Sequence, residues 1–203
     1  MIGYKLTTQK MTTYGGFQWI VGVERSIKRK DQPLCSDAWL HYYQHPLLAV
    51  FHNPIHGAIR QPRFFECEVG GRIKHDGQLK SGCTRMTLVE EIELPKITPE
   101  QRVRYAIFCA REVCAEPAFV RWSDGWLDGR TVESAAEERV RAWVAKRAVA
   151  AAQAVLTAKW IARAAAEAGA ADAAADAAAD AAAVAGNINL IALALRAVGE
   201  ENG

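Results

Sequence analysis

Histidine pairs are the first residues in this sequence whose spacing suits chemistry. His41 and His45 are four residues apart, and so are His52 and His56. On a helix this spacing places two imidazoles on one face, where they can bind a metal ion such as zinc. A proline interrupts each segment, however, and no His-Glu-x-x-His pattern accompanies them. We therefore interpret these histidines as surface or hydrogen-bonded side chains near a turn, and we expect no metal site.

The cysteines point the same way. The chain has five of them, and no two form a Cys-x-x-Cys pair: Cys35, Cys67, Cys83, Cys109 and Cys114. A zinc site would need paired spacing. An odd number without pairing predicts free thiols, several of them buried as small apolar residues in a reducing compartment. No cofactor motif is present, so we expect no cofactor.

Charge and hydropathy exclude several classes of protein. The formal net charge is only +2, and the single basic run, Lys28-Arg29-Lys30, is short. Both facts argue against a nucleic-acid partner. No stretch approaches the roughly 20 apolar residues of a membrane span, and no apolar leader follows Met1. These features predict a cytoplasmic protein of a bacterial cell that does not contact a membrane.

The first 97 residues are expected to be rich in strands. Aromatic and β-branched residues at 17–21 predict one strand, and alternation at 63–69 predicts a second that ends at Gly70-Gly71. A third strand is expected over residues 86–94. Residues 39–51 are expected to form a short helix, because Pro46 suits a first helical turn and apolar residues repeat behind it.

The rest of the chain is expected to be helical. Thr98, Pro99 and Gln101 form a capping-box pattern before a helix over 98–116, and a shorter helix follows over 117–127. From residue 132 to 185, alanine supplies 27 of 54 residues, which strongly favours helix. Asn187 is expected to cap a last short helix that ends near Val198. The predicted fold class is therefore α+β.

This pattern predicts three regions. A strand-rich domain spans 1–97, linking helices packed on it span 98–131, and an alanine-rich region spans 132–203. Alanine faces bury little area, so such helices need neighbours to be stable. We expect residues 132–185 to form a homo-oligomer, the alternative being a hairpin folded back at Gly169.

A resemblance covers most of the chain. Its motifs are Gly16-Phe17-Gln18, Leu34-Cys35, Trp39-Leu40-His41, Pro46-Leu47 and the stretch Arg63-Phe64-Phe65-Glu66-Cys67-Glu68-Val69. They resemble a family of uncharacterised bacteriophage and prophage proteins with Gly-Phe-x-Tyr, Cys-x-x-Gly-Phe-His and Pro-Leu-x-x-Phe motifs. Trp39-Leu40-His41 departs from the family's Gly-Phe-His. The resemblance implies a phage setting and no particular activity.

A second resemblance concerns fold only. The aromatic-glycine start and the histidine near a strand are similar to the sheets of ADP-ribosyltransferases. That resemblance would make His41, Tyr42 and Glu90 (or its neighbour Glu91) the catalytic residues of an enzyme that modifies a host protein. The simpler interpretation places the glutamates on the solvent face of strands.

The function predicted from these observations is binding, with no catalytic residue. A phage-type accessory protein would occupy the surface of a host protein or complex, such as a CRISPR effector or another defence system. The candidate binding residues are Trp39, His41, Arg60, Arg63, Trp122 and Trp126. Tryptophan and arginine dominate interface energetics, although tryptophans at helical spacing more often belong to a core. A virion-associated structural protein is the other alternative.

Overall fold

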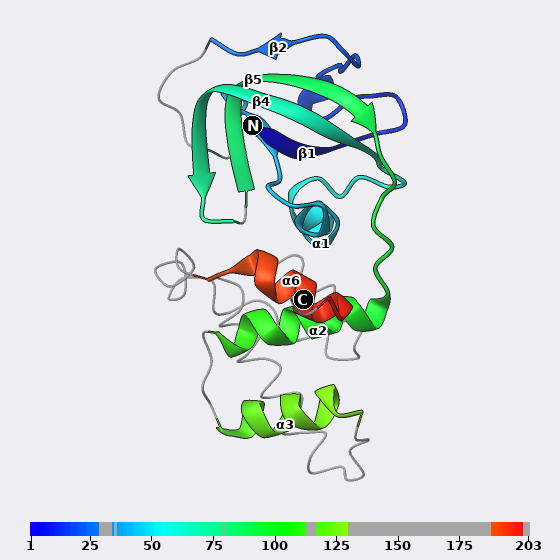
Figure 1. Ribbon diagram of the computed structural model, residues 1–203, viewed down its shortest axis with the longest axis vertical. Helices are drawn as coiled ribbons and strands as arrows, with labels where there is room; N and C mark the ends of the chain where they lie inside the picture. Colours follow the sequence, from blue (N-terminus) through cyan, green and yellow to red (C-terminus); the bar gives the residue numbers. More distant parts are fainter. Residues whose placement is uncertain (29–33, 35, 79, 113–116, 130–187, 201–203) are drawn as a thin grey trace. The chain divides into compact units, whose positions relative to one another are not determined.

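The protein has an α+β fold, with a sheet in its N-terminal part and helices after it (Figure 1). The computed structural model describes residues 1–28, 34, 36–78, 80–112, 117–129 and 188–200. The chain divides into two compact units, Met1–Lys96 and Ile97–Gly203. The boundary between the units lies beside the change from strand-rich to helical sequence.

An antiparallel sheet forms the N-terminal unit. Within the described residues it has five strands: β1 (Ile2–Thr7), β2 (Arg25–Ser26), β3 (Leu40–Tyr42), β4 (Arg63–Asp76) and β5 (Lys80–Glu91). Their order is β1-β4-β5-β2, and β3 also pairs with β5. β2 and β3 therefore share one edge of β5, because β4 occupies the other edge along its length. A single 3-10 turn, η1 (Tyr14–Gly16), lies in the loop after β1.

The sheet curls until its ends meet. The Tyr4 N–H of β1 donates to the Tyr43 carbonyl at 2.9 Å, and the Tyr43 N–H, just after β3, donates back at 2.9 Å. β4 and β5 bend strongly (Figure 1), with register shifts between Glu66 and Cys67 and between Gly70 and Ile73. Such irregularities increase twist and allow a small sheet to close. The result is a small barrel-like sheet with an interior of its own.

Both faces of β1 are consequently buried. Gly3 faces the interior, since a Cβ there would lie 2.5 Å from the Tyr42 ring. Lys5 is two residues further along and shares that face, because strand side chains alternate. On the opposite face Leu6 packs with Ala49 of helix α1. The interior core consists of Trp19, Leu40, Tyr42, Phe65, Cys67, Val69, Cys83, Met86 and Leu88.

Helix α1 (Pro46–His56) begins where Pro46 predicts a first helical turn. The imidazole of His45 caps it by accepting a hydrogen bond from the Leu47 N–H at 3.3 Å. The expected start at residue 39 was wrong, because Leu40–Tyr42 pair with β5 instead. Pro54 lies inside the helix rather than interrupting it. It falls in the last turn, where a missing N–H removes one hydrogen bond near the helix end.

The strand predictions in this unit held only in part. Residues 63–69 are a strand as expected, but β4 continues through Gly70-Gly71 to Asp76. The expected strand over 86–94 begins earlier, at Lys80, and ends at Glu91. Residues 17–21 form no strand: Thr13 N–H bonds the Phe17 carbonyl and Trp19 N–H bonds the Met11 carbonyl. These bonds make a compact loop that returns Trp19 to the core.

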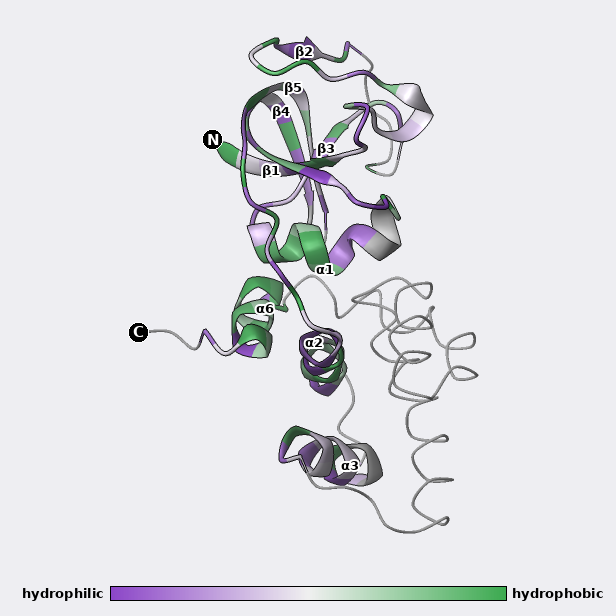
Figure 2. Ribbon diagram, turned by 90° about the vertical axis from the view of Figure 1, so that its right-hand side faces the viewer, coloured by the Kyte–Doolittle hydropathy of each residue, from purple (hydrophilic) through white to green (hydrophobic). Residues whose placement is uncertain are grey.

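The C-terminal unit shows three helices among its described residues: α2 (Pro99–Arg111), α3 (Pro117–Leu127) and α6 (Leu190–Val198). The capping box of α2 is confirmed, because Thr98 accepts from the Gln101 N–H at 3.1 Å while Gln101 accepts from the Thr98 N–H at 2.9 Å. Helix α6 is mostly hydrophobic (Figure 2) and contacts α2, where Arg196 lies 4.2 Å from the Phe108 ring centre.

Two further expectations for this unit concern the cap of the last helix and the alanine-rich segment. Asn189, and not Asn187, caps α6: its side chain accepts from the Ala192 N–H at 3.0 Å. Residues 113–116 and 130–187, with the alanine-rich segment 132–185 and its predicted oligomerisation, lie outside the described residues. Across the part of the chain that is described, no helix is long and apolar enough to cross a membrane.

Candidate functional site

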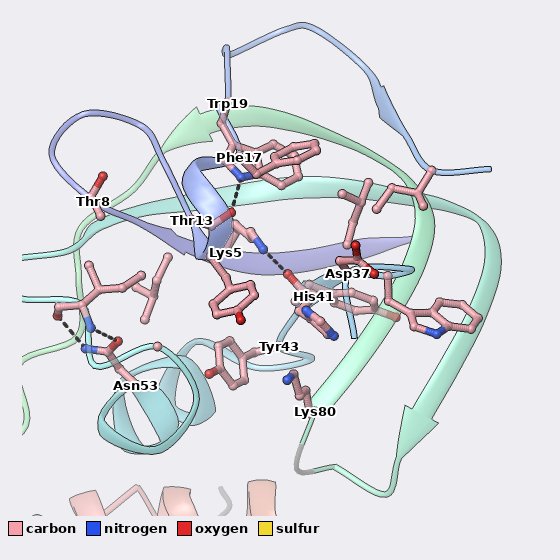
Figure 3. A pocket seen from close by; sticks show the side chains of 18 of the residues that line it. Lys5, Thr8, Thr13, Phe17, Trp19, Asp37, His41, Tyr43, Asn53 and Lys80 are labelled. Carbon is pink, nitrogen blue, oxygen red and sulfur yellow. Dashed lines mark hydrogen bonds between the residues drawn. The ribbon is translucent and has the colours of Figure 1, made fainter. Parts of the chain in front are cut away.

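A cavity of about 820 Å³ lies in the N-terminal unit (Figure 3). Its walls come from β1, the loop over residues 8–19, the chain around β3, the end of α1 and the start of β5. Aromatic side chains form much of the lining: Tyr14, Phe17, Trp19, Trp39, Tyr42 and Tyr43. The charged residues in the lining are Lys5, Asp37 and Lys80, together with His41. This volume is in the range of sites that take small organic molecules.

Lys5 is the least expected residue of this lining. Only 7% of it is exposed, because β1 points its side chain towards the interior. Its Nζ donates a hydrogen bond to the His41 carbonyl at 2.5 Å and lies 5.0 Å from the Trp19 ring centre (Figure 3). Burial lowers the pKa of Lys5 to about 8, although the neighbouring thiols of Cys67 and Cys83 act in the opposite direction. A substantial fraction of Lys5 is therefore an uncharged amine in mildly alkaline solution.

His41 is held in one tautomer. Its Nε2 lies 2.5 Å from the Leu34 carbonyl oxygen. A carbonyl only accepts hydrogen bonds, so Nε2 carries the hydrogen and Nδ1 keeps a lone pair. Burial lowers the pKa of His41 to about 4, outweighing the Leu34 hydrogen bond, and the charges of Lys80 and Lys5 lower it further. At neutral pH His41 is therefore an uncharged imidazole whose Nδ1 can accept a hydrogen bond.

Trp19 supplies the inner aromatic wall. It is 1% exposed, and its Nε1 donates to the Thr13 hydroxyl at 3.0 Å (Figure 3). Phe17 packs against it with ring centres 5.1 Å apart. Trp39, 8% exposed, lines the cavity as well, with the Arg72 guanidinium 5.6 Å from its ring centre. Both indole rings give the cavity flat apolar surfaces, and that of Trp19 lies beside the Lys5 amine.

Ser81 joins β3 and the β4–β5 hairpin through polar contacts. Its hydroxyl lies 2.8 Å from His75 Nδ1 and 2.9 Å from Gln44 Nε2, and it also bonds Tyr42. A serine beside a histidine suggests a nucleophile, but Ser81 is only 1% exposed. Burial raises the pKa of the Tyr42 phenol to about 12, so this group stays protonated. The cluster therefore holds the strands together and does not present a reactive hydroxyl.

The transferase triad is not brought together. His41 pairs with Gly82 of β5, whereas Glu90 lies eight residues further along the same strand, opposite Glu66. At about 3.3 Å per residue the two positions are up to about 26 Å apart along the strand. Glu90 and Glu91 are exposed, as the simpler interpretation predicts. Tyr42 lines the cavity with His41, but no carboxylate from the end of β5 joins them.

The six predicted binding residues belong to different parts of the two units. Trp39 and His41 share the cavity. Arg60 is exposed in the loop after α1, and Arg63 is held by Glu91 at 2.5 Å. Trp122 and Trp126 belong to α3 in the C-terminal unit.

Where the structure describes them, the other histidines and the cysteines considered as metal ligands or nucleophiles contribute to packing and helix capping. His45 caps α1, and His52 is completely buried with its ring 6.2 Å from that of Tyr43. Among the described residues, no three His, Cys, Asp or Glu side chains gather where a metal ion could bind. Cys67 and Cys83 are free and buried, and burial raises their pKa values to about 12 and about 11. Such thiols are poor nucleophiles.

Gly82 packs closely against Trp39, a residue of the cavity lining, and this packing can be tested. A Cβ at this position would lie 2.6 Å from the Leu34 side chain and 2.9 Å from Trp39 Cβ. We expect Gly82→Ala to lower the free energy of unfolding by about 1–3 kcal/mol, because the crowded side chains must shift. Gly70→Ala is the control, since its nearest neighbour is the Arg85 side chain at 3.4 Å. Urea denaturation compares them; equal stability of the two variants would contradict this packing.

Among known proteins, no curated protein and no solved structure matches the chain. One family model matches, and the match covers 100 of the 203 residues. It contains the whole N-terminal unit, and with it the cavity, Lys5 and His41. Residues 1–100 are thus similar to the family described as a domain of unknown function (DUF7666).

Proposed function

We propose that the N-terminal unit is a ligand-binding domain that takes a small, flat organic anion into its cavity. The observation that carries this proposal is the Lys5 amine, buried in the cavity lining against the Trp19 ring. Burying a lysine in a protein core is costly, and a core of this size would be more stable with an apolar residue there. A bound anion would offset that cost, because it stabilises the protonated amine.

The charges of the lining support an anion over a cation. Lys5 and Lys80 bring two positive charges against one negative charge from Asp37, and His41 is neutral near pH 7. Lys80 and Lys5 each lower the pKa of His41, so both amines act on the same part of the cavity. The aromatic lining favours a flat ligand, because such rings stack at low entropic cost. A carboxylate or phosphate on a planar ring combines both features.

The test uses flat anions and their neutral counterparts. Benzoate, indole-3-acetate and AMP are titrated by calorimetry into the full chain, alongside benzamide, indole-3-acetamide and adenosine. We expect at least one anion to bind about ten-fold more tightly than its neutral counterpart, as a charge-assisted hydrogen bond predicts. Lys80→Gln should weaken that preference, because it removes one of the two positive charges of the lining and leaves Lys5 in place. Lys10→Gln, an exposed lysine outside the cavity, is the matched control and should keep it.

Two results would contradict the proposal. The first is that none of the three anions binds saturably below about 1 mM, a limit that corresponds to roughly 4 kcal/mol of binding free energy. The second is that anions and neutral counterparts bind alike and that Lys80→Gln changes neither. Binding that Lys80→Gln and Lys10→Gln weaken equally would place the anion on the surface, away from the cavity.

A second candidate is binding to a host protein in a phage setting, including inhibition of a defence complex. Its support is a group of exposed aliphatic side chains: Ile20 is 50% exposed, Val21 45% and Val23 41%. Their loop is fixed to β5 where the Gly22 N–H donates to the Leu88 carbonyl at 2.8 Å, next to Val89, which is 41% exposed. Grouped exposed apolar side chains often mark interaction sites.

This candidate is tested with a tagged protein and bacterial lysate. We expect a stoichiometric partner to be retained by the wild type and lost when Val21 and Val23 are both replaced with serine. A Val89→Ser variant should weaken the same partner. A partner retained equally by all three proteins would remove this surface from consideration.

A further inference from the structure

We propose that the Lys5 amine forms an imine with the carbonyl group of an aldehyde or α-keto acid bound in the cavity. This proposal deepens the ligand-binding function and rests on it. It specifies one chemical class of ligand, a small carbonyl compound that also carries a negative charge. It also assigns Lys5 a covalent role that the resemblances do not suggest.

The placement of Lys5 is the first argument. The residue occupies an inward position of β1, with the core residues Cys67 and Cys83 near it on one side and the cavity on the other. Its Nζ is held by the His41 carbonyl at 2.5 Å, so the amine occupies a defined position (Figure 3). A long flexible side chain fixed in this way loses little further entropy when it reacts.

The second argument is the charge state of the amine. Only an unprotonated amine attacks a carbonyl, and burial brings the pKa of Lys5 to about 8. About half of the Lys5 side chains are thus reactive at pH 8, against roughly one in 300 for a lysine with the ordinary value. Desolvation of this kind is how lysines are prepared for imine chemistry in proteins.

The groups that face Lys5 permit this state. The thiols of Cys67 and Cys83 have raised pKa values and remain uncharged at pH 8. Lys80 lowers the pKa of Lys5, and His41 is neutral. Among the described residues, the pKa of Lys5 is shifted by burial, by the thiols of Cys67 and Cys83 and by Lys80. For a carbonyl ligand the anionic group pairs with Lys80 instead of Lys5, so that Lys5 keeps its lowered pKa where it meets the carbonyl group.

The reaction balances without an oxidant or reductant. The Lys5 nitrogen bonds to the carbonyl carbon, giving a carbinolamine after a proton moves from nitrogen to oxygen. The carbon–oxygen bond then breaks, and the oxygen leaves as water when a second nitrogen proton is transferred. His41 lines the same cavity, but its low pKa makes it a weak base, so solvent water carries these protons. Hydrolysis reverses the steps and releases the ligand.

The test traps the imine in the full-length wild-type protein. Glyoxylate, a small anionic aldehyde, is added at pH 8 with sodium cyanoborohydride, and peptide mass spectrometry measures the rate of modification at each lysine. We expect Lys5 to be modified at least ten-fold faster than exposed Lys10, with a rate that saturates in glyoxylate. The rate of modification at Lys5 should rise as the pH approaches about 8 and level off above it, as the lowered pKa of this amine requires. Lys5→Arg removes the fast site, whereas Lys10→Arg leaves it.

The outcomes separate this proposal from the ligand-binding function. Fast, saturable labelling of Lys5 supports the imine, and protection by a bound flat anion places the reaction in the cavity. Labelling of Lys5 no faster than Lys10 overturns the imine proposal, even if flat anions bind. If Lys5 labels quickly but no flat anion binds or protects, the imine stands and the preference for flat anions is wrong.

Discussion

Replacing Lys5 with methionine is expected to raise the free energy of unfolding of the N-terminal unit by about 2 kcal/mol at pH 7. Folding lowers the pKa of Lys5 from 10.5 to about 8, which corresponds to a cost of about 3 kcal/mol for burying the charged form. Methionine avoids this cost and has similar length. It loses the hydrogen bond to the His41 carbonyl, which offsets about 1 kcal/mol.

The stability difference between Lys5→Met and the wild type should depend on pH. Below about pH 8, Lys5 is protonated in both the folded and the unfolded states, so the whole cost is present. Between about 8 and 10.5 the unfolded state binds more protons than the folded state, so the wild type regains stability as the pH rises. The advantage of Lys5→Met should therefore disappear across this window. Cys67 and Cys83 have the opposite effect at alkaline pH, but they are present in both proteins and cancel.

Urea denaturation at several pH values measures the difference between the two proteins. Lys10→Met serves as the matched control, because Lys10 is exposed and its replacement should change stability by less than about 0.5 kcal/mol at every pH. If Lys5→Met were less stable than the wild type at pH 7, with a difference independent of pH, the buried amine would not be destabilising. The argument that it is retained for ligand binding would then fail.

Truncation of Trp19 is expected to cause the largest loss of stability, about 4 kcal/mol for Trp19→Ala. The side chain is 1% exposed and belongs to the interior core. Its removal leaves a large void, frees the Thr13 hydroxyl from its 3.0 Å hydrogen bond and removes the ring beside the Lys5 amine. Water that enters this space should bring the pKa of Lys5 back towards its ordinary value.

Two comparisons make the Trp19 prediction specific. Trp19→Phe keeps a ring in the core and should cost less than half as much as Trp19→Ala. Tyr14→Ala, at a residue that is 94% exposed in the cavity lining, should leave stability nearly unchanged. Thermal and urea unfolding measure all three variants. If Trp19→Ala and Tyr14→Ala were equally mild, Trp19 would not be a core residue. Fast labelling of Lys5 in a folded Trp19→Ala protein would show that Trp19 is not needed to lower its pKa.

Features with short-range causes could be predicted from the sequence. The capping box of Thr98 and Gln101 involves groups three residues apart, so its residue types indicate the start of α2. Pro46 marks the first turn of α1 for a similarly local reason. The division near residue 97 follows a change of composition, which separates the sheet from the helices.

Parts of the strand prediction were wrong because a strand is defined by partners that are distant in the sequence. β1 and β3 are six and three residues long, and each is defined by partners more than 35 residues away. Residues 17–21 have strand-forming side chains, yet bonds to Met11 and Thr13 hold them in a loop. Intrinsic preference for strand is weaker than such tertiary contacts. The same reason separates His41 from Glu90, since only the register of β3 on β5 sets their distance.

Lys5 shows most clearly what tertiary structure decided. In β1 the apolar residues Ile2, Tyr4 and Leu6 alternate with Gly3 and Lys5, so periodicity alone would place the lysine in solvent. That inference assumes that only one face of the strand is buried. Here α1 covers the Leu6 face, and the curled sheet encloses the other. The sequence alone determined the capping box that starts α2 and the change of composition near residue 97. The sheet closes through contacts between residues that are distant in the sequence. This closure is what places Lys5 in the lining of a cavity.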